Sequence, residues 1–151
     1  MAVTIRLLGS ADAALIATAA DVFDHCPQAH LTAEFLQDPR HHLIAAIDDS
    51  QLVGFISAVH YVHPDKPAEL WINEVGVAPS HQGQGIGRQM LRLVLEHGKK
   101  LGCVNAWVLT DRNNPAAMRL YAGAGGVEAE KPAVMFEFGL EGGESITESQ
   151  P

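Results

Sequence analysis

A glycine-rich turn is the segment of the sequence best suited to bind an anion. It reads His81-Gln82-Gly83-Gln84-Gly85-Ile86-Gly87 and lies between a strand-like segment and an amphipathic helical one. Glycines let a phosphate approach the backbone closely, and a helix start offers unpaired N–H donors at the positive end of the helix dipole. A P-loop would need Gly-Lys-Ser/Thr after the glycines, but Arg88 follows. A dinucleotide-binding turn would need G-x-G-x-x-G, whereas the spacing here is G-x-G-x-G.

A second motif follows the turn at a fixed distance and reads Asn114-x-x-Ala117-x-x-Leu120-Tyr121-x-x-x-Gly125. The turn itself extends back as Val77-Ala78-Pro79-x-x-Gln82-Gly83-x-Gly85-Ile86-Gly87. Together the two motifs resemble those of the GNAT N-acetyltransferases, whose coenzyme A signature is Gln/Arg-x-x-Gly-x-Gly/Ala. The motifs lie within residues 70–125, and Gly126 departs from the bulky apolar residue of most members. The resemblance implies acetyl-CoA as co-substrate and no metal.

The resemblance also implies roles for individual residues in acetyl transfer from a thioester to an amine. This reaction needs an uncharged amine, a stabilised oxyanion and a proton for the departing thiolate. Glu74, near the end of the expected fourth strand, is implied to be the general base. The backbone N–H groups of Val75 and Val77 are implied to bind the pantetheine and the thioester carbonyl, and Tyr121 to protonate the thiolate. The residues expected to contact coenzyme A are therefore Val75, Val77, Gln82, Gly83, Gly85, Gly87, Arg88, Asn114 and Tyr121.

Each of these assignments has a plainer alternative. Glu74 could be a solvated carboxylate at a strand edge, Tyr121 a packed core ring, and Asn114 a helix cap. Many GNAT enzymes have Arg at the position of Gln82, so Arg88 either replaces that cationic contact or lies on the helix surface.

A narrower resemblance concerns the acceptor. Three segments resemble the type I aminoglycoside 3-N-acetyltransferases, which are antibiotic-resistance enzymes: Asp21-Val22-Phe23, Tyr61-Val62-x-Pro64 and Glu69-Leu70-Trp71-Ile72-x-Glu74-Val75-x-Val77. The resemblance implies acetylation of an aminoglycoside amine, at the 3-position, by direct attack in a ternary complex, and a homodimer. An acidic groove would receive this polycation, and the candidate carboxylates are Asp21, Asp24, Glu74, Asp111 and Glu137. The alternatives are another cationic small amine, a protein amino group, or a non-catalytic acyl-CoA-binding sensor.

Composition narrows the class of protein further. The 151 residues carry a formal charge of −8 and no cluster of Lys and Arg, which argues against nucleic-acid binding. No apolar run is long enough to span a bilayer, and the N-terminus does not read as a signal peptide. Two cysteines suit a reducing compartment, so we expect a cytoplasmic protein without a membrane partner. The eight histidines lack the spacing of a zinc site.

The elements that must position these residues follow from hydrophobic periodicity. We expect one domain over residues 1–140 and a polar, disordered tail over 141–151. The expected strands are residues 3–8, 41–47, 52–62, 69–77, 103–110 and 133–140, and the expected helices are residues 10–23, 32–36, 86–101 and 114–122. This order predicts an α/β (α+β) GNAT fold with a mixed, mostly antiparallel central sheet flanked by helices.

Overall fold

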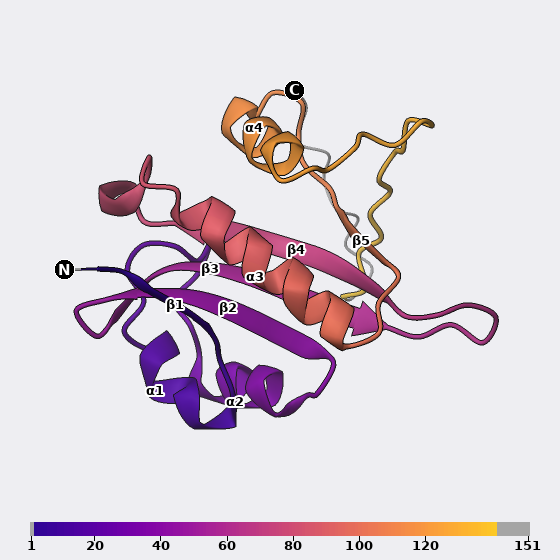
Figure 1. Ribbon diagram of the computed structural model, residues 1–151. Coiled ribbons are helices and arrows are strands. Elements are labelled where there is room, and N and C mark those ends of the chain that lie inside the picture. Colours follow the sequence, from indigo (N-terminus) through magenta and orange to yellow (C-terminus); the bar gives the residue numbers. More distant parts are fainter. Residues whose placement is uncertain (1, 142–151) are drawn as a thin grey trace.

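The computed structural model describes residues 2–141 and is built on a five-stranded sheet (Figure 1). The strands follow the chain in the order β1 (Thr4–Leu7), β2 (His41–Asp48), β3 (Gln51–Tyr61), β4 (Glu69–Val77) and β5 (Asn105–Val108). Neighbouring strands are antiparallel except β4 and β5, which are parallel. The expected mixed, mostly antiparallel sheet is therefore confirmed.

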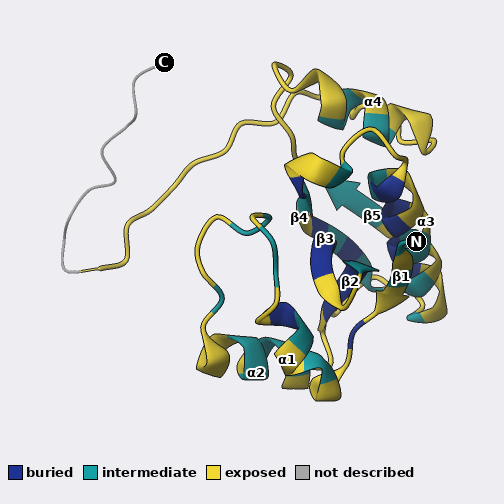
Figure 2. Cartoon of the chain, turned by 90° about the vertical axis from the view of Figure 1, so that its left-hand side faces the viewer, coloured by how far each residue is buried: buried dark blue, intermediate teal, exposed yellow. Residues whose placement is uncertain are grey.

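Helices cover both faces of this sheet. The long helix α3 (Ile86–Lys100) packs on one face, and the short α1 (Ala13–Ile16) and α2 (Ala29–Gln37) lie on the other (Figure 2). The helix α4 (Pro115–Gly123) lies near the start of α3, and two 3-10 turns span Ser10–Asp12 and Pro79–His81. None of the helices among residues 2–141 is long and apolar enough to cross a membrane.

The alternation of side chains along the strands divides the core into two clusters. Ile44 and Ile56 point toward α3, where they meet Met90. Their strand neighbours Leu43 and Phe55 point to the opposite face, toward α1 and α2. Both β2 and β3 are buried on each face, and β3 pairs with β4 along one of its edges.

The other side of β4 is only partly paired. The ladder between β4 and β5 ends at the pair Ile72 and Val108, whereas β4 continues to Val77 alongside β3. The register between β3 and β4 shifts between Ser57 and Ala58, which leaves Asn73 without a partner in that ladder. Such a bulge re-aims the strand locally. Residues 73–77 of β4 therefore have a free edge facing the start of α3 and α4.

The expected helix over residues 10–23 is wrong beyond Ile16. The helix ends at Ile16 because the residues that follow form hydrogen bonds with the start of β3 instead of continuing the helix. Thr18 Oγ1 donates to Leu15 O (2.6 Å) and accepts from Leu52 N (3.1 Å), and Ala20 N donates to Leu52 O (2.9 Å). These bonds to β3 replace further helical turns, so tertiary pairing overrides the periodicity.

The expected strand over residues 133–140 is also wrong, because residues 126–141 form no helix or strand. This segment extends away from the rest of the chain (Figure 2). An alternating apolar pattern becomes a strand only when it finds a ladder partner, and it meets none among the described residues. The tail was expected to begin at residue 141, and residues 142–151 of it lie outside the described part of the chain.

Candidate active site

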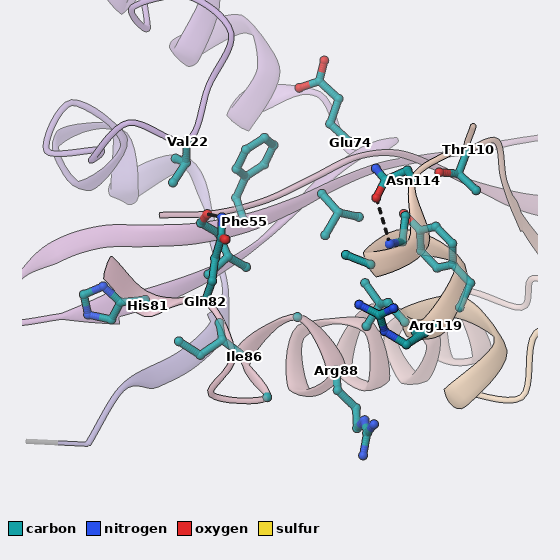
Figure 3. A pocket seen from close by; sticks show the side chains of 18 of the residues that line it. Val22, Phe55, Glu74, His81, Gln82, Ile86, Arg88, Thr110, Asn114 and Arg119 are labelled. Carbon is teal, nitrogen blue, oxygen red and sulfur yellow. Dashed lines mark hydrogen bonds between the residues drawn. The ribbon is translucent and has the colours of Figure 1, made fainter. Parts of the chain in front are cut away.

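A cavity of about 800 Å³ lies beside the free edge of β4. Its walls come from β4, the turn before α3, the start of α3, the segment after β5, and α4 (Figure 3). Every residue that the sequence assigned to catalysis or to coenzyme A lines it, namely Glu74, Val75, Val77, Gln82, Gly83, Gly85, Gly87, Arg88, Asn114 and Tyr121. Two motifs separated by about 30 residues of sequence thus meet at one site.

The turn between β4 and α3 fits the binding of phosphates. Gly83 and Gly85 have φ values of 76° and 77°, and a Cβ on either would meet no atom within 4 Å. The space above both backbones is therefore open. The first helical bond of α3 runs from Gln89 N to Gly85 O (3.1 Å), so the amides before Gln89 have no helical partner. No side chain caps α3, so these amides are free to bind an anion.

Side chains hold this turn in place. Gln82 Nε2 donates to Val77 O (3.0 Å), which links the turn to the last residue of β4. His81 Nε2 lies 2.7 Å from Asp48 Oδ2, and His81 Nδ1 lies 2.7 Å from Ser80 Oγ. His81 also lines the cavity. The sequence analysis included His81 in the turn but gave it no role, because its partner Asp48 is distant in sequence and no local signal joins the two residues.

Two arginines line the cavity, one expected and one missed. Arg88 is exposed, and its side chain points away from the other labelled residues (Figure 3). The surface alternative for Arg88 thus agrees with its orientation in the structure. Arg119 of α4 also lines the cavity and extends toward the start of α3 (Figure 3). Arg119 directly precedes Leu120 and Tyr121 of the second motif, and this position within the motif was the available signal.

Glu74 lies between the cavity and a second, smaller one. The second cavity measures about 400 Å³ and lies between the sheet, the end of α1, and α2. Glu74, Asn73 and Phe55 line both cavities. The carboxylate of Glu74 is exposed and points away from Asn114, toward the side of α1 and α2 (Figure 3). A group held in the smaller cavity would therefore meet a ligand of the larger cavity beside Glu74.

The two remaining polar residues from the second motif also line the larger cavity. Asn114 caps α4, because its Oδ1 accepts from Ala117 N (3.1 Å). Its other amide atom is left for a ligand. Burial raises the pKa of the Tyr121 hydroxyl. Tyr121 therefore keeps its proton at neutral pH, as a proton donor must.

The candidate carboxylates for a cationic acceptor are not all at this site. Asp24 and Glu74 line the larger cavity, whereas Asp21, Asp111 and Glu137 line neither cavity. Asp111 is used locally, because its Oδ1 accepts from Asn113 N (2.8 Å) in the turn before α4. Glu137 lies in the extended segment after α4. Among residues 2–141, no group of three or more His, Cys, Asp and Glu could hold a metal ion.

Comparison with known proteins gives the family. The model of the acetyltransferase (GNAT) family matches residues 12–125, and the chain belongs to this family. It is 36% identical to the N-alpha-acetyltransferase RimI of Mycobacterium tuberculosis, over 82% of this chain and 77% of RimI. It is 34% identical to a mycothiol acetyltransferase of Saccharopolyspora erythraea over 56% of this chain, and it spans only 26% of that relative.

Among solved structures, the fold is similar to that of an aminoglycoside acetyltransferase from an uncultured soil metagenomic sample, in complex with sisomicin. The TM-score is 0.79 at 17% identity, over 92% of this chain and 97% of that one. This likeness shows the fold. The family and the relatives together identify the chain as an acetyl-CoA-dependent N-acetyltransferase, rather than a non-catalytic sensor.

Proposed function

Because the chain belongs to the GNAT acetyltransferases, we propose that it acetylates an amine of an aminoglycoside, with the 3-amino group as the expected position. The amine attacks acetyl-CoA directly while both are bound. The observation that carries this proposal is the position of Glu74, which lines both the larger cavity, with its phosphate-binding turn, and the smaller cavity beside it.

The larger cavity would hold acetyl-CoA, which is the co-substrate of the amine acceptor. The free amides at the start of α3 and the open backbone at Gly83 and Gly85 suit its pyrophosphate. From there the free edge of β4 leads toward Glu74 and offers backbone groups to the pantetheine arm. The N–H groups of Val75 and Val77 would donate to the thioester carbonyl oxygen as it gains negative charge.

Glu74 and Tyr121 each carry out one of the proton transfers that the reaction needs. Glu74 accepts a proton from the acceptor ammonium, which frees the nitrogen lone pair to attack the acetyl carbon. A C–N bond then forms and the C–S bond breaks. Tyr121 donates its hydroxyl proton to the departing thiolate, and burial keeps that proton available at neutral pH. The acylated nitrogen then loses its second proton and Tyr121 regains one, through solvent, while Glu74 returns its proton to solvent. The products are the acetylated amine and coenzyme A.

Charge supports an aminoglycoside as acceptor. The chain has a formal charge of −8, and Asp24 joins Glu74 at the cavity. Carboxylates around a cleft attract a polycation and pair with its ammonium groups. The similarity in fold to the enzyme solved with sisomicin is consistent with such an acceptor.

A second acceptor class, the amino group of a polypeptide, is favoured by two observations. One is the identity of 36% with RimI, whose name describes N-alpha-acetylation. The other is the lining of the smaller cavity, where Phe23, Leu31 and Phe35 contribute apolar surface. An apolar side chain next to the reacting amine would fit there.

The test is release of coenzyme A thiol from acetyl-CoA by the purified protein. Gentamicin, kanamycin, spermidine and a peptide beginning with a large apolar residue serve as separate acceptors. We expect turnover with gentamicin, and NMR of the product then gives the acetylated position. Turnover with the peptide alone would replace the aminoglycoside by the second acceptor class. If no thiol is released with any aminoglycoside although acetyl-CoA binds, the proposed substrate is refuted.

A further inference from the structure

The smaller cavity has a buried hydroxyl group in its wall. Ser57 of β3 lines this cavity and is only 8% exposed. Its neighbours on the same face of the sheet are apolar and buried, since Leu43 is paired with it on β2 and Phe55 precedes it by two residues on β3. A hydroxyl in such surroundings costs free energy unless it forms a hydrogen bond.

The hydroxyl of Ser57 has no hydrogen-bond partner within residues 2–141. The buried polar or charged residues of this part of the chain are His42 and Ser57. Both ring nitrogens of His42 are paired, with His60 (2.7 Å) and His97 (3.0 Å). No fully buried side-chain oxygen or nitrogen in the same part of the chain lacks a partner. The unpaired oxygen of Ser57 is therefore accessible from the cavity and free to bind a ligand.

The sheet places this hydroxyl next to the Glu74 side chain. Ser57 and Glu74 are directly opposite each other in the antiparallel ladder between β3 and β4. Opposite residues send their side chains to the same face, with Cβ atoms about 4.5–5.5 Å apart. Both side chains line the smaller cavity, and the carboxylate of Glu74 points toward the side of α1 and α2 (Figure 3). A nitrogen atom bound to Glu74 at the junction of the two cavities therefore lies within reach of Ser57.

An amine that attacks a thioester needs its lone pair aimed at the carbonyl carbon. A deprotonated primary amine carries two N–H bonds and one lone pair, arranged tetrahedrally with the bond to its own carbon. A single acceptor leaves the nitrogen free to rotate about that bond, whereas acceptors on both N–H bonds fix the direction of the lone pair. As the new C–N bond forms, the nitrogen gains positive charge, so both N–H groups become stronger donors. Two oxygen atoms beside the nitrogen would therefore both orient it and stabilise the transition state.

We propose that Ser57 is a further catalytic residue, whose Oγ accepts one N–H of the attacking primary amine while Glu74 accepts the other. This inference rests on the role of Glu74 in the proposed function. It applies to an aminoglycoside and to a polypeptide alike, because both present a primary amine. It also implies a preference for primary over secondary amines, since a deprotonated secondary amine has a single N–H and leaves one of the two oxygen atoms without a donor.

The test is the kcat/KM of Ser57→Ala for thiol release, with gentamicin and a peptide beginning with leucine as separate acceptors. We expect a fall of about 10-fold to 100-fold, which is the loss of one hydrogen bond to a charged group, with an unchanged Kd for acetyl-CoA. The control variant is Thr4→Val, which removes a hydroxyl from an exposed residue of β1 outside both cavities and should keep the wild-type kcat/KM. Thermal melting should show no loss of stability in Ser57→Ala, because the hydroxyl has no partner to lose.

A second comparison separates a hydrogen bond to the amine from a packing effect. Each acceptor that turns over is compared with its counterpart carrying one methyl group on the reacting nitrogen. Wild type should prefer the primary amine by about tenfold or more, and Ser57→Ala should lose most of this preference by losing activity on the primary amine.

The outcomes distinguish the role of Ser57 from the proposed function. An unchanged kcat/KM in Ser57→Ala, or an equal preference for the primary amine in both proteins, overturns the role of Ser57 and leaves that of Glu74 standing. Turnover with the peptide alone refutes the aminoglycoside as acceptor, and the peptide then tests Ser57 in the same way. Absence of turnover with every primary amine overturns both.

Discussion

A chain of three hydrogen-bonded histidines makes the stability of this protein depend on pH. His42 on β2 is 7% exposed and lies between the sheet and α3. Its Nε2 lies 2.7 Å from His60 Nδ1, and its Nδ1 lies 3.0 Å from His97 Nε2. Burial first, and then the neighbouring His97, His60 and His41, lower the pKa of His42 from 6.5 to about 4, while Asp38 opposes them. Folding therefore favours the neutral form of His42.

The sign and magnitude of the effect follow from this shift. The folded pKa lies below the unfolded value, so the unfolded chain binds more protons between pH 4 and 6.5. The stability is fully present above pH 6.5 and is lost as the pH falls toward 4. A shift from 6.5 to about 4, at 1.36 kcal/mol per pKa unit, corresponds to about 3 kcal/mol. The pKa of His97 is lowered as well, by burial first and then by His60 and Lys100, and adds to the loss.

Urea unfolding at pH 7.5, 6.5, 5.5 and 4.5 measures this loss directly. Wild type should lose about 2 kcal/mol of unfolding free energy between pH 6.5 and 4.5 through His42 alone. In His42→Gln this part of the pH dependence should disappear. The matched control is His30→Gln, because His30 is exposed on α2 and is not among the groups that shift the pKa of His42, so its replacement should leave the slope unchanged. Equal slopes for wild type and His42→Gln would refute the reasoning.

Three further predictions concern the active site. Gly76→Ala places a Cβ 2.8 Å from Val22 O and 2.9 Å from a ring carbon of Phe55, so thermal melting should show a loss of about 1–3 kcal/mol. Gly85→Ala puts a side chain at a φ of 77° beside the phosphate-binding amides, and calorimetry should show acetyl-CoA binding weakened by about tenfold or more. Tyr121→Phe removes the proton donor, so kcat should fall roughly 10²-fold while the Kd for acetyl-CoA stays within about threefold.

The strands and helices that depend mainly on local sequence patterns were predicted well. The strand over residues 69–77 and the helix after the glycine-rich turn agree with β4 and α3, because strong periodicity and an unambiguous turn bound both. The helix over residues 10–23 was overestimated, since Leu52, far along the chain, competes for its backbone groups. The strand over residues 133–140 has the right pattern, but strand formation depends on a partner that the pattern does not name.

The coenzyme A half and the acceptor half of the site also differ in how well the sequence predicted them. The coenzyme A half depends on two contiguous motifs, so residues such as Gln82 and Asn114 could be placed from their spacing. The acceptor half depends on which loops and helices approach Glu74 in space. Carboxylates chosen for charge alone, such as Asp111 and Glu137, therefore lie elsewhere, while the apolar lining of the smaller cavity had no signal in the sequence.

The central claim is that Glu74 accepts the amine proton at the junction of the two cavities. Its most direct test is the kcat of Glu74→Gln for thiol release, measured beside its Kd for acetyl-CoA. The matched control is Glu69→Gln on the same strand, whose carboxylate is bound to Asn105 and His63 outside both cavities. We predict that Glu74→Gln lowers kcat by about 10²–10⁴-fold with an unchanged Kd, while Glu69→Gln keeps near-wild-type turnover. Wild-type kcat in Glu74→Gln would contradict the account.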